Sequence, residues 1–419
     1  MSSRRCGGRC CFVSTANRIA RIAAANQVFT PTAPIDDAAL FAGRSEQTVK
    51  VIGAITQKGQ HAVLFGERGV GKTSLAKIIG SMLRGMGRQD VVTAHVNVFG
   101  SDSYEAVWTN IFEDIPVESS EAPISITGTR PAVSVTTLAS LLPNPPAVAD
   151  IRRVLSAFCR SSRVIIILDE FDRASREVKS QFADMIKWLS DATMQATLLI
   201  VGVADTIDEL IAEHLSIERA LKQIHMPRMS ESELAEIVDK GLAKLQMTIE
   251  ASARTALTSL SRGLPHYTHA LALHAAVVAI EADQPLISRV HVTTAIKRAL
   301  EDAHQSTKSA YTKAVSSSHR ESLYAQVLLA CSLAHCDPMG YFAPADVRDP
   351  MTKIMGEPYD IENFNQHLAA FCEDARGSVL HRIGGERRYR YRFSNPLMQP
   401  YVMLRGIQVG MLKAEDWGL

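Results

Sequence analysis

The sequence lacks an apolar run long enough to cross a bilayer, and it has almost no net charge. The longest apolar stretches, such as 270–280, fall well short of the roughly 20 residues that a membrane-spanning helix needs. Lys and Arg number 45 against 44 Asp and Glu, so no overall field draws the chain to nucleic acid or to a membrane. Seven scattered cysteines, an odd number, argue against a disulfide framework. We expect reduced thiols, no membrane partner and a cytoplasmic protein.

The composition is that of an ordinary globular protein, with 46% hydrophobic and 21% charged residues. A chain of 419 residues can build two or three packed domains. Strand-like and helical patterns alternate in its first half, which predicts a parallel sheet covered on both faces. A Pro-, Ser- and Thr-rich interruption at 116–135 is expected to be a surface insertion. The strand-like runs are 61–65, 91–98, 164–168, 197–203 and 224–226.

The second half of the chain reads as helical from residue 230. Ser230 and Glu233 have the spacing of a capping box at the start of the first of these helices. Near the end, two apolar and aromatic runs flank a Gly-Gly-Glu turn, a hairpin signal that follows amphipathic helices and so predicts a winged helix. We divide the chain into a disordered tail (1–34), a nucleotide-binding domain (35–229), a helical lid (230–302), a linker (303–319), a winged-helix domain (320–408) and a C-terminal tail (409–419).

A phosphate-binding motif stands at 66–73, where GERGVGKT matches G-x-x-x-x-G-K-[ST] in full between a predicted strand and a predicted helix. The glycines let backbone N–H groups turn toward phosphates at a helix N-terminus, which favours anions. Lys72 is predicted to pair with the β- and γ-phosphates, and the Thr73 hydroxyl to bind Mg²⁺. The predicted cofactors are ATP and Mg²⁺, held by Gly66, Glu67, Arg68, Gly69, Val70, Gly71, Lys72, Thr73 and Ser74.

Two carboxylates follow the apolar run 164–168, at the strand end where ligands bind in open α/β sheets. Asp169 is predicted to hold the Mg²⁺ shell, and Glu170 to orient and polarise the attacking water. An acidic pair after a strand is often only a solvated loop, but its separation from the phosphate motif favours a catalytic site.

Together with the helical segment after them, these motifs resemble those of the AAA+ ATPases. LFAGR (40–44) is similar to the adenine-side box of that family. The segments GERGVGKTS and LDEFDR resemble most closely the origin-recognition initiator branch, and the resemblance covers 36–408. It implies an α/β fold, with a P-loop parallel sheet and helical lid followed by a C-terminal winged-helix domain, and an ATPase. We expect hydrolysis to be slow, as in a switch, because the chain departs from the family at its sensor positions.

The chain departs from that family at both sensor positions. Where a polar sensor is expected after the fourth strand, it offers Asp205, which the γ-phosphate would repel, or Thr206. The arginine sensor of the lid is missing, and Pro265 and His266 stand in its place. This Gly-x-Pro turn resembles the nucleotide-contacting turn of STAND signalling ATPases. A plain helix–helix turn with a packed proline is an equal alternative.

An arginine finger is a further expectation of the resemblance. Arg219 lies just before the short fifth strand, where AAA+ relatives place an arginine that completes the site of a neighbouring subunit. Arg228 is the competing candidate, and a solvated surface charge is the alternative for either residue. An ATP-dependent homo-oligomer follows from the finger assignment.

The predicted hairpin is rich in arginine, and strand alternation would place Arg388, Arg390 and Arg392 on one face and aromatic rings on the other. With Arg387, they form a candidate surface for double-stranded DNA. The alternative is a solvated edge strand. The leading interpretation is an ATP switch that couples nucleotide state to DNA binding. The alternatives are a STAND-like signalling or defence ATPase whose winged helix binds protein, and an ATPase regulator of a separate nuclease, transposase or helicase.

Overall fold

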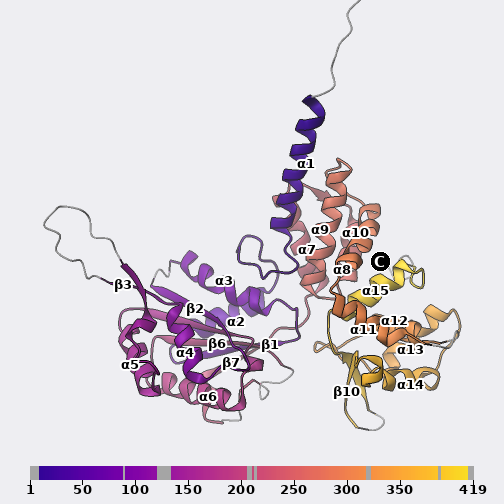
Figure 1. The fold of residues 1–419 in the computed structure, drawn as a ribbon. Coiled ribbons are helices and arrows are strands. Elements are labelled where there is room, and N and C mark those ends of the chain that lie inside the picture. Colours follow the sequence, from indigo (N-terminus) through magenta and orange to yellow (C-terminus); the bar gives the residue numbers. More distant parts are fainter. Residues whose placement is uncertain are drawn as a thin grey trace, which may run out of the picture.

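The structure is a computed structural model that describes residues 9–87, 90–119, 134–204, 210–211, 215–317, 322–385 and 388–413. Figure 1 shows a sheet with flanking helices, a helical lid from which the first helix projects, and a C-terminal unit beside the lid. We use "C-terminal unit" for the described part of 322–413. No helix in these ranges is long and apolar enough to cross a membrane.

Five parallel strands form the central sheet, in the order β2-β5-β6-β1-β7, which confirms the predicted parallel sheet. The strand that precedes the phosphate motif, β1, therefore lies between two others, and its residues Ala62 to Leu64 are fully buried. The strands are β1 (His61–Gly66), β2 (Val91–Asn97), β5 (Arg163–Asp169), β6 (Ala196–Val203) and β7 (Leu221–His225).

Alternate residues of each strand pack on opposite faces of the sheet, as the pleat requires. Leu64 and Ile165 belong to the core beneath α2 and α3, whereas Val63 and Ile166 belong to the core beneath α4, α5 and α6. Both faces are covered, which explains why these strands are apolar throughout. The covering helices are α2 (Ser45–Thr56), α3 (Lys72–Gly85), α4 (Tyr104–Glu113), α5 (Val148–Phe158) and α6 (Arg176–Asp191).

The predicted insertion begins and ends in a two-stranded antiparallel ladder, formed by β3 (Pro116–Ser119) and β4 (Ser134–Thr137). Residues 120–133 lie outside the described part of the chain. A short 3-10 helix, η1 (Leu138–Leu141), returns the chain to α5, so the ladder is an excursion from the α/β unit.

The lid contains four helices and a short parallel ladder. Its first helix starts with the predicted capping box, because the Glu233 N–H donates to Ser230 Oγ (3.3 Å) and the Ser230 N–H donates to Glu233 Oε2 (2.9 Å). The helices are α7 (Glu231–Lys244), α8 (Ala251–Leu260), α9 (Pro265–Glu281) and α10 (Arg289–Asp302), and the ladder pairs β8 (Thr248–Ile249) with β9 (Leu286–Ile287).

The N-terminal segment is helical, so the prediction of a disordered tail is wrong for its described residues. Helix α1 (Arg9–Val28) packs its last turn on the lid, where Ala25, Val28 and Phe29 are buried. Phe29 rests where a side chain on Gly241 of α7 would otherwise lie. This burial comes from residues more than 200 positions away, which local sequence pattern does not reveal.

The segment expected to be a linker also folds, as α11 (Gln305–Val315), with Thr307 and Ala314 buried. The C-terminal unit then confirms the predicted winged helix: helices precede a hairpin whose strands pair from Leu380 opposite Phe393 to Ile383 opposite Arg390. Its elements are α12 (Tyr324–Leu333), α13 (Pro344–Met355), α14 (Ile361–Ala370), β10 (Leu380–Ile383), β11 (Arg390–Phe393) and α15 (Met398–Gln408).

The lid and the C-terminal unit share one apolar core, which also takes in the end of α1. Leu271 of α9, Leu328 of α12 and Met403 of α15 are buried in this same cluster, together with Val28. The sheet has its own cores on its two faces. The lid and the C-terminal unit are therefore joined more continuously to each other than either is to the sheet.

Candidate functional site

The phosphate motif forms the loop between β1 and α3, and its glycines take backbone conformations that other residues avoid. Gly66 (φ 146°) passes so close to the Met226 carbonyl that a side chain would overlap it. Gly71 (φ 93°) is the N-cap of α3, which begins at Lys72. The loop thus turns its backbone toward the N-terminus of α3, where unpaired N–H groups and the helix dipole favour an anion.

Lys72 is buried at the start of α3 and its amine points back into the loop. Nζ donates to the carbonyls of Gly66 (2.9 Å) and Glu67 (2.7 Å). Burial lowers the pKa of Lys72 to about 8, although the nearby carboxylates of Asp172 and Asp169 oppose this shift. An ammonium held only by carbonyl oxygens in a buried site is well placed to accept a phosphate as a stronger partner.

Asp169 ends β5 directly beside α3. Its carboxylate receives hydrogen bonds from the Thr73 hydroxyl and from the Glu170 N–H (2.9 Å), and His95 Nε2 of β2 lies 3.5 Å from Oδ2. Burial raises the pKa of Asp169, but these hydrogen bonds outweigh it and the pKa is lowered. A carboxylate and a hydroxyl in contact are hard oxygen ligands of the kind that Mg²⁺ accepts in phosphate sites.

Glu170 also lines the pocket, but its side chain is engaged elsewhere. Its backbone is left-handed (φ 55°), and its Oε2 receives a hydrogen bond of 2.6 Å from Arg173 Nη1. Asp172 of the same loop faces the pocket too, and it accepts the Val203 N–H at 2.9 Å. The sequence motif includes Asp172 and β2 includes His95, yet nothing in their spacing indicated that both would approach the predicted metal ligands.

The LFAGR segment reaches the pocket through Arg44, which is buried with a left-handed backbone (φ 62°). Arg44 Nη2 donates to the Val70 carbonyl at 2.8 Å, whereas Nε and Nη1 are buried and have no hydrogen-bond partner among the described residues. Burial lowers the pKa of Arg44 to about 10. Unpaired guanidinium nitrogens beside the phosphate loop fit a site that takes an anionic or hydrogen-bonding ligand.

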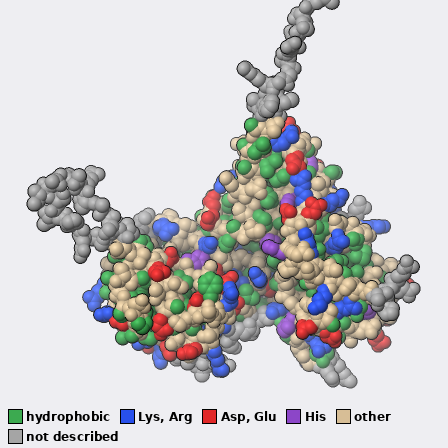
Figure 2. All heavy atoms as spheres, in the orientation of Figure 1, with side chains coloured by type: hydrophobic (Ala, Val, Ile, Leu, Met, Phe, Trp, Pro, Cys, Tyr) green, Lys and Arg blue, Asp and Glu red, His purple; other side chains and the backbone are tan. Residues whose placement is uncertain are grey.

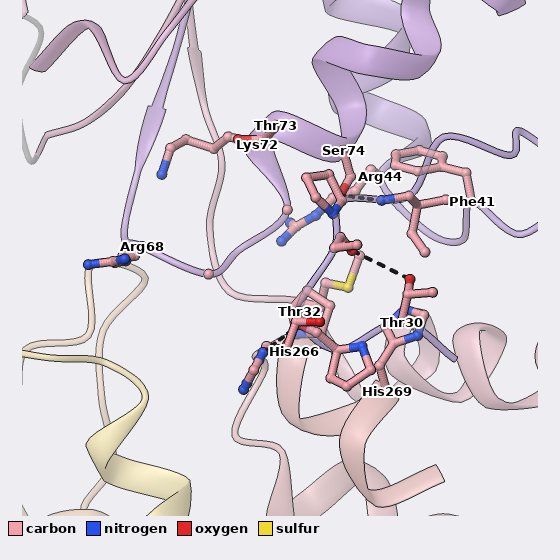
Figure 3. A pocket seen from close by; sticks show the side chains of 18 of the residues that line it. Thr30, Thr32, Phe41, Arg44, Arg68, Lys72, Thr73, Ser74, His266 and His269 are labelled. Carbon is pink, nitrogen blue, oxygen red and sulfur yellow. Dashed lines mark hydrogen bonds between the residues drawn. The ribbon is translucent and has the colours of Figure 1, made fainter. Parts of the chain in front are cut away.

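These groups line one cavity of about 360 Å³, within the usual size range of small-molecule sites. Residues 29–35, which we call the strap, cross it between the lid and α3: the Ile35 N–H donates to Ser74 Oγ (3.2 Å), and Pro31 O lies 2.7 Å from His266 Nδ1. Figure 3 shows Lys72 and Thr73 on one side of the pocket and His266 and His269 on the other. The orphaned nitrogens and the phosphate loop together fit a bound nucleotide.

The Gly-x-Pro turn of the lid lies at this pocket. Pro265 is the first residue of α9, and a side chain on Gly71 would touch its ring at 3.9 Å. His266 and His269, on the first turns of α9, also line the cavity. The turn is therefore in position to contact a ligand. This position favours nucleotide contact over the alternative of a plain helix–helix turn.

The predicted arginine fingers differ in surroundings. Arg219, in η4 (Leu215–Ala220), is exposed and does not line the pocket of its own chain. Arg228 pairs within the chain instead: its Nε donates to Glu67 Oε2 at 2.6 Å, and its Nη2 to Glu67 Oε1 at 3.1 Å. Arg228 is therefore directed toward the phosphate loop of its own chain in this structure, and the choice between Arg219 and Arg228 as the finger stays a prediction. Asp205, Thr206 and Arg387 lie outside the described residues.

The hairpin arginines alternate with aromatic rings as predicted, since Tyr391 and Phe393 are buried while Arg388 and Arg390 are exposed. Arg390 Nη2 lies 2.9 Å from Asp337 Oδ2, and the Arg392 guanidinium lies 4.7 Å from the centre of the Tyr341 ring. Figure 2 shows acidic and basic side chains intermixed over the face that it displays.

A comparison with protein-family models matches residues 33–314 to nSTAND1, described as Novel STAND NTPase 1. No curated protein matches the chain. Its fold is similar to that of Cdc6p from Pyrobaculum aerophilum, at 12% identity over 92% of this chain and 99% of that one, with a TM-score of 0.45. The ORC1 protein of Aeropyrum pernix, solved in complex with DNA, gives 14% identity, 93% and 98% coverage and a TM-score of 0.47. A Walker-type ATPase of Pyrococcus abyssi is 14% identical over 90% of this chain and 99% of that one, with a TM-score of 0.49.

Proposed function

The chain belongs to the Novel STAND NTPase 1 family, and on this premise we propose that it is an ATP-dependent conformational switch whose C-terminal unit docks on its own phosphate loop. Membership of an NTPase family implies nucleotide binding. This is the signalling-ATPase alternative raised by the sequence, in which the winged helix meets protein. It replaces DNA binding as the leading interpretation.

One junction carries the proposal: Glu67, Arg228 and Gln399, which we call the Arg228 junction. Glu67 belongs to the phosphate loop, Arg228 follows β7, and Gln399 is fully buried in α15 of the C-terminal unit. Arg228 holds Glu67 with two hydrogen bonds, and its Nη1 donates to Gln399 Oε1. Gln399 Nε2 donates in turn to the Ser332 carbonyl of α12 at 2.9 Å. A continuous polar chain therefore links the phosphate loop to the C-terminal unit.

Other contacts bring the same unit to the pocket. Leu397, just before α15, lines the cavity beside Gly69, and its carbonyl accepts the Tyr267 hydroxyl of α9 at 2.8 Å. Gly340, after α12, lies so close to the Glu67 carboxylate that a side chain would overlap it. The C-terminal unit thus forms part of the wall of the nucleotide site.

The physical coupling runs through Glu67. Its carbonyl accepts the Lys72 amine, while its carboxylate holds Arg228. A phosphate that draws Lys72 away from this carbonyl acts on the residue that anchors the C-terminal unit. Undocking would break the hydrogen bond between the Arg228 guanidinium and Gln399. A hydrogen bond from a charged group contributes roughly 1.5–3 kcal/mol, so this bond favours the docked state.

With ATP bound, Lys72 would meet the phosphates, and Thr73 and Asp169 would hold a Mg²⁺ ion that neutralises phosphate charge. Glu170 would accept the proton of the attacking water after its carboxylate leaves Arg173. Because the Glu170–Arg173 ion pair must open before the water is activated, hydrolysis is expected to be slow, which suits a switch.

The test measures release of a fluorescent nucleotide and the radius of gyration by X-ray scattering. Gln399→Leu and Arg228→Ala should speed release about tenfold, since each removes a hydrogen-bonded link of the junction, and should expand the protein. Arg254→Ala is the matched control, because Arg254 forms an exposed lid ion pair with Asp239 (2.7 Å). Lys72→Ala should abolish binding. Release rates and dimensions that match the control in both junction variants would contradict the docking proposal.

A further inference from the structure

The strap side of the pocket contains a polar group that the phosphate chemistry leaves unused. His269 of α9 is 7% exposed, lines the cavity, and its Nδ1 is buried without a hydrogen-bond partner among the described residues. Buried polar atoms in folded proteins are nearly always paired, and an unpaired one costs about 1–3 kcal/mol. A ligand that enters this cavity can supply the missing partner.

The surroundings of His269 indicate what kind of ligand group it meets. Its ring contacts Phe29 edge-on, with centroids 6.0 Å apart, and the same cavity is lined by Phe41, Ile237 and the strap prolines. Burial lowers the pKa of His269 to about 4, so the imidazole is neutral at pH 7 and offers one donor and one acceptor. Apolar side chains with a neutral imidazole among them suit an aromatic heterocycle better than a phosphate.

The position of His269 agrees with this reading. In Figure 3 it lies on the α9 side with Thr30 and Thr32, across the pocket from Lys72. The strap is tied to both walls, through Pro31 to His266 and through Ile35 to Ser74. A nucleotide with its phosphates at Lys72 would therefore extend its base beneath the strap.

We infer that His269 Nδ1 accepts a hydrogen bond from the exocyclic amino group of the adenine base, and so determines the base preference of this site. The inference rests on the proposed binding of ATP. The phosphate loop contributes affinity for any nucleoside triphosphate, whereas His269 discriminates among bases. This hydrogen bond requires the neutral tautomer with its proton on Nε2, which leaves a lone pair on Nδ1. Inosine and guanosine nucleotides present a carbonyl oxygen at that position, which repels this lone pair instead of pairing with it.

The experiment compares the binding affinities of two proteins for two ligands. The affinities are measured by calorimetry, so the readout does not depend on ATP hydrolysis. Wild-type protein and His269→Phe are each titrated with ATP and with purine riboside triphosphate, which lacks only the exocyclic amino group. Loss of that group should weaken wild-type binding roughly five- to tenfold, the usual value of one hydrogen bond. In His269→Phe the two ligands should bind equally, at the weaker level.

Two further variants keep the test decisive. His269→Asn retains a carbonyl acceptor and should recover part of the preference for ATP, even if the phenylalanine variant is unstable. His274→Phe is the matched control on the same helix, since His274 lies outside the pocket and its Nε2 is 3.3 Å from Asp302. That variant should keep the wild-type ratio.

The outcomes separate this inference from the proposed function. Equal weakening of both ligands in His269→Phe, with the wild-type ratio preserved, would show a packing role and overturn the inference. A wild-type protein that binds both ligands equally would overturn it as well. Failure of every triphosphate to bind would instead refute the proposed nucleotide switch.

Discussion

The Glu170 carboxylate is paired with Arg173 in the structure, whereas the proposed mechanism needs it to contact the attacking water. The ion pair with Arg173 is short (2.6 Å), but both side chains are 51% exposed. Exposed pairs contribute little, typically below about 1 kcal/mol, so Arg173 is a weak competitor for the water that Glu170 is proposed to activate. Glu170 is therefore restrained but not locked.

Glu170→Gln should bind ATP yet hydrolyse it roughly 10²–10⁴-fold more slowly, because an amide is no general base. Arg173→Ala should instead raise hydrolysis severalfold by freeing the carboxylate. Phosphate release under single-turnover conditions measures both. Arg153→Ala provides the control, since Arg153 makes a comparable surface pair with Asp150 (2.7 Å) away from the pocket. Undiminished hydrolysis in Glu170→Gln would remove that residue from the mechanism.

Whether a site residue could be predicted from the sequence depends on how far along the chain its partners lie. Lys72, Thr73 and Asp169 could be predicted because a strand, a loop and a helix in order fix where they lie. The pairing of Arg228 could not be predicted, since its partners Glu67 and Gln399 are 161 and 171 positions away. The role of His269 could likewise not be predicted, because its burial depends on contact with Phe29 of the strap, 240 residues earlier in the chain.

At the scale of elements, the sheet strands were predictable from continuous apolar runs and the hairpin from two runs that flank a Gly-Gly-Glu turn, whereas α1 was not. Residues 15–20 of α1 are exposed, whereas Ala25 and Val28 in its last turns are buried. Such a helix has little periodic signal of its own and is stabilised by packing on the lid. The same reason applies to α11, whose Ser- and Lys-rich sequence resembles a linker.

The hairpin β10–β11 leads to a prediction about DNA. Arg390 is paired with Asp337, and Arg392 lies over Tyr341, so two of the arginines predicted to meet phosphates already have partners within the chain. We expect no ATP-dependent shift of short duplex DNA by the wild-type protein at moderate salt. The measurement is an electrophoretic mobility shift with and without ATP across a salt series.

The contrary result would be specific. Salt-sensitive duplex binding whose log–log slope flattens by up to about two units when Arg388 and Arg390 are replaced by Ala would restore the DNA-coupled interpretation. Replacing Arg348 and Lys353, two basic residues of α13, removes the same number of positive charges outside the hairpin and controls for a nonspecific loss of positive charge.

For the whole molecule, Arg219 remains a prediction about assembly. It is exposed in η4, next to the edge strand β7, and does not line the pocket of its own chain, so it is accessible to a second copy. We expect Arg219→Ala to hydrolyse ATP poorly, and a mixture with Lys72→Ala to recover partly, because the mixture pairs an intact finger with an intact phosphate loop.

Hydrolysis rates of the single and mixed proteins decide this, with sedimentation showing whether ATP promotes association. Lys222→Ala is the control, since Lys222 is exposed on β7 a few residues further along. Normal hydrolysis by Arg219→Ala alone would end the finger assignment.

Helix α1 is attached to the core that the lid and the C-terminal unit share, so it moves with them. At 20 residues it is about 30 Å long, and its last turn is buried in the shared core, next to the strap that crosses the nucleotide pocket. In Figure 1 its free end projects beyond the lid. A tilt of the lid about the nucleotide pocket would therefore displace the far end of α1 more than the turn that is buried in the core.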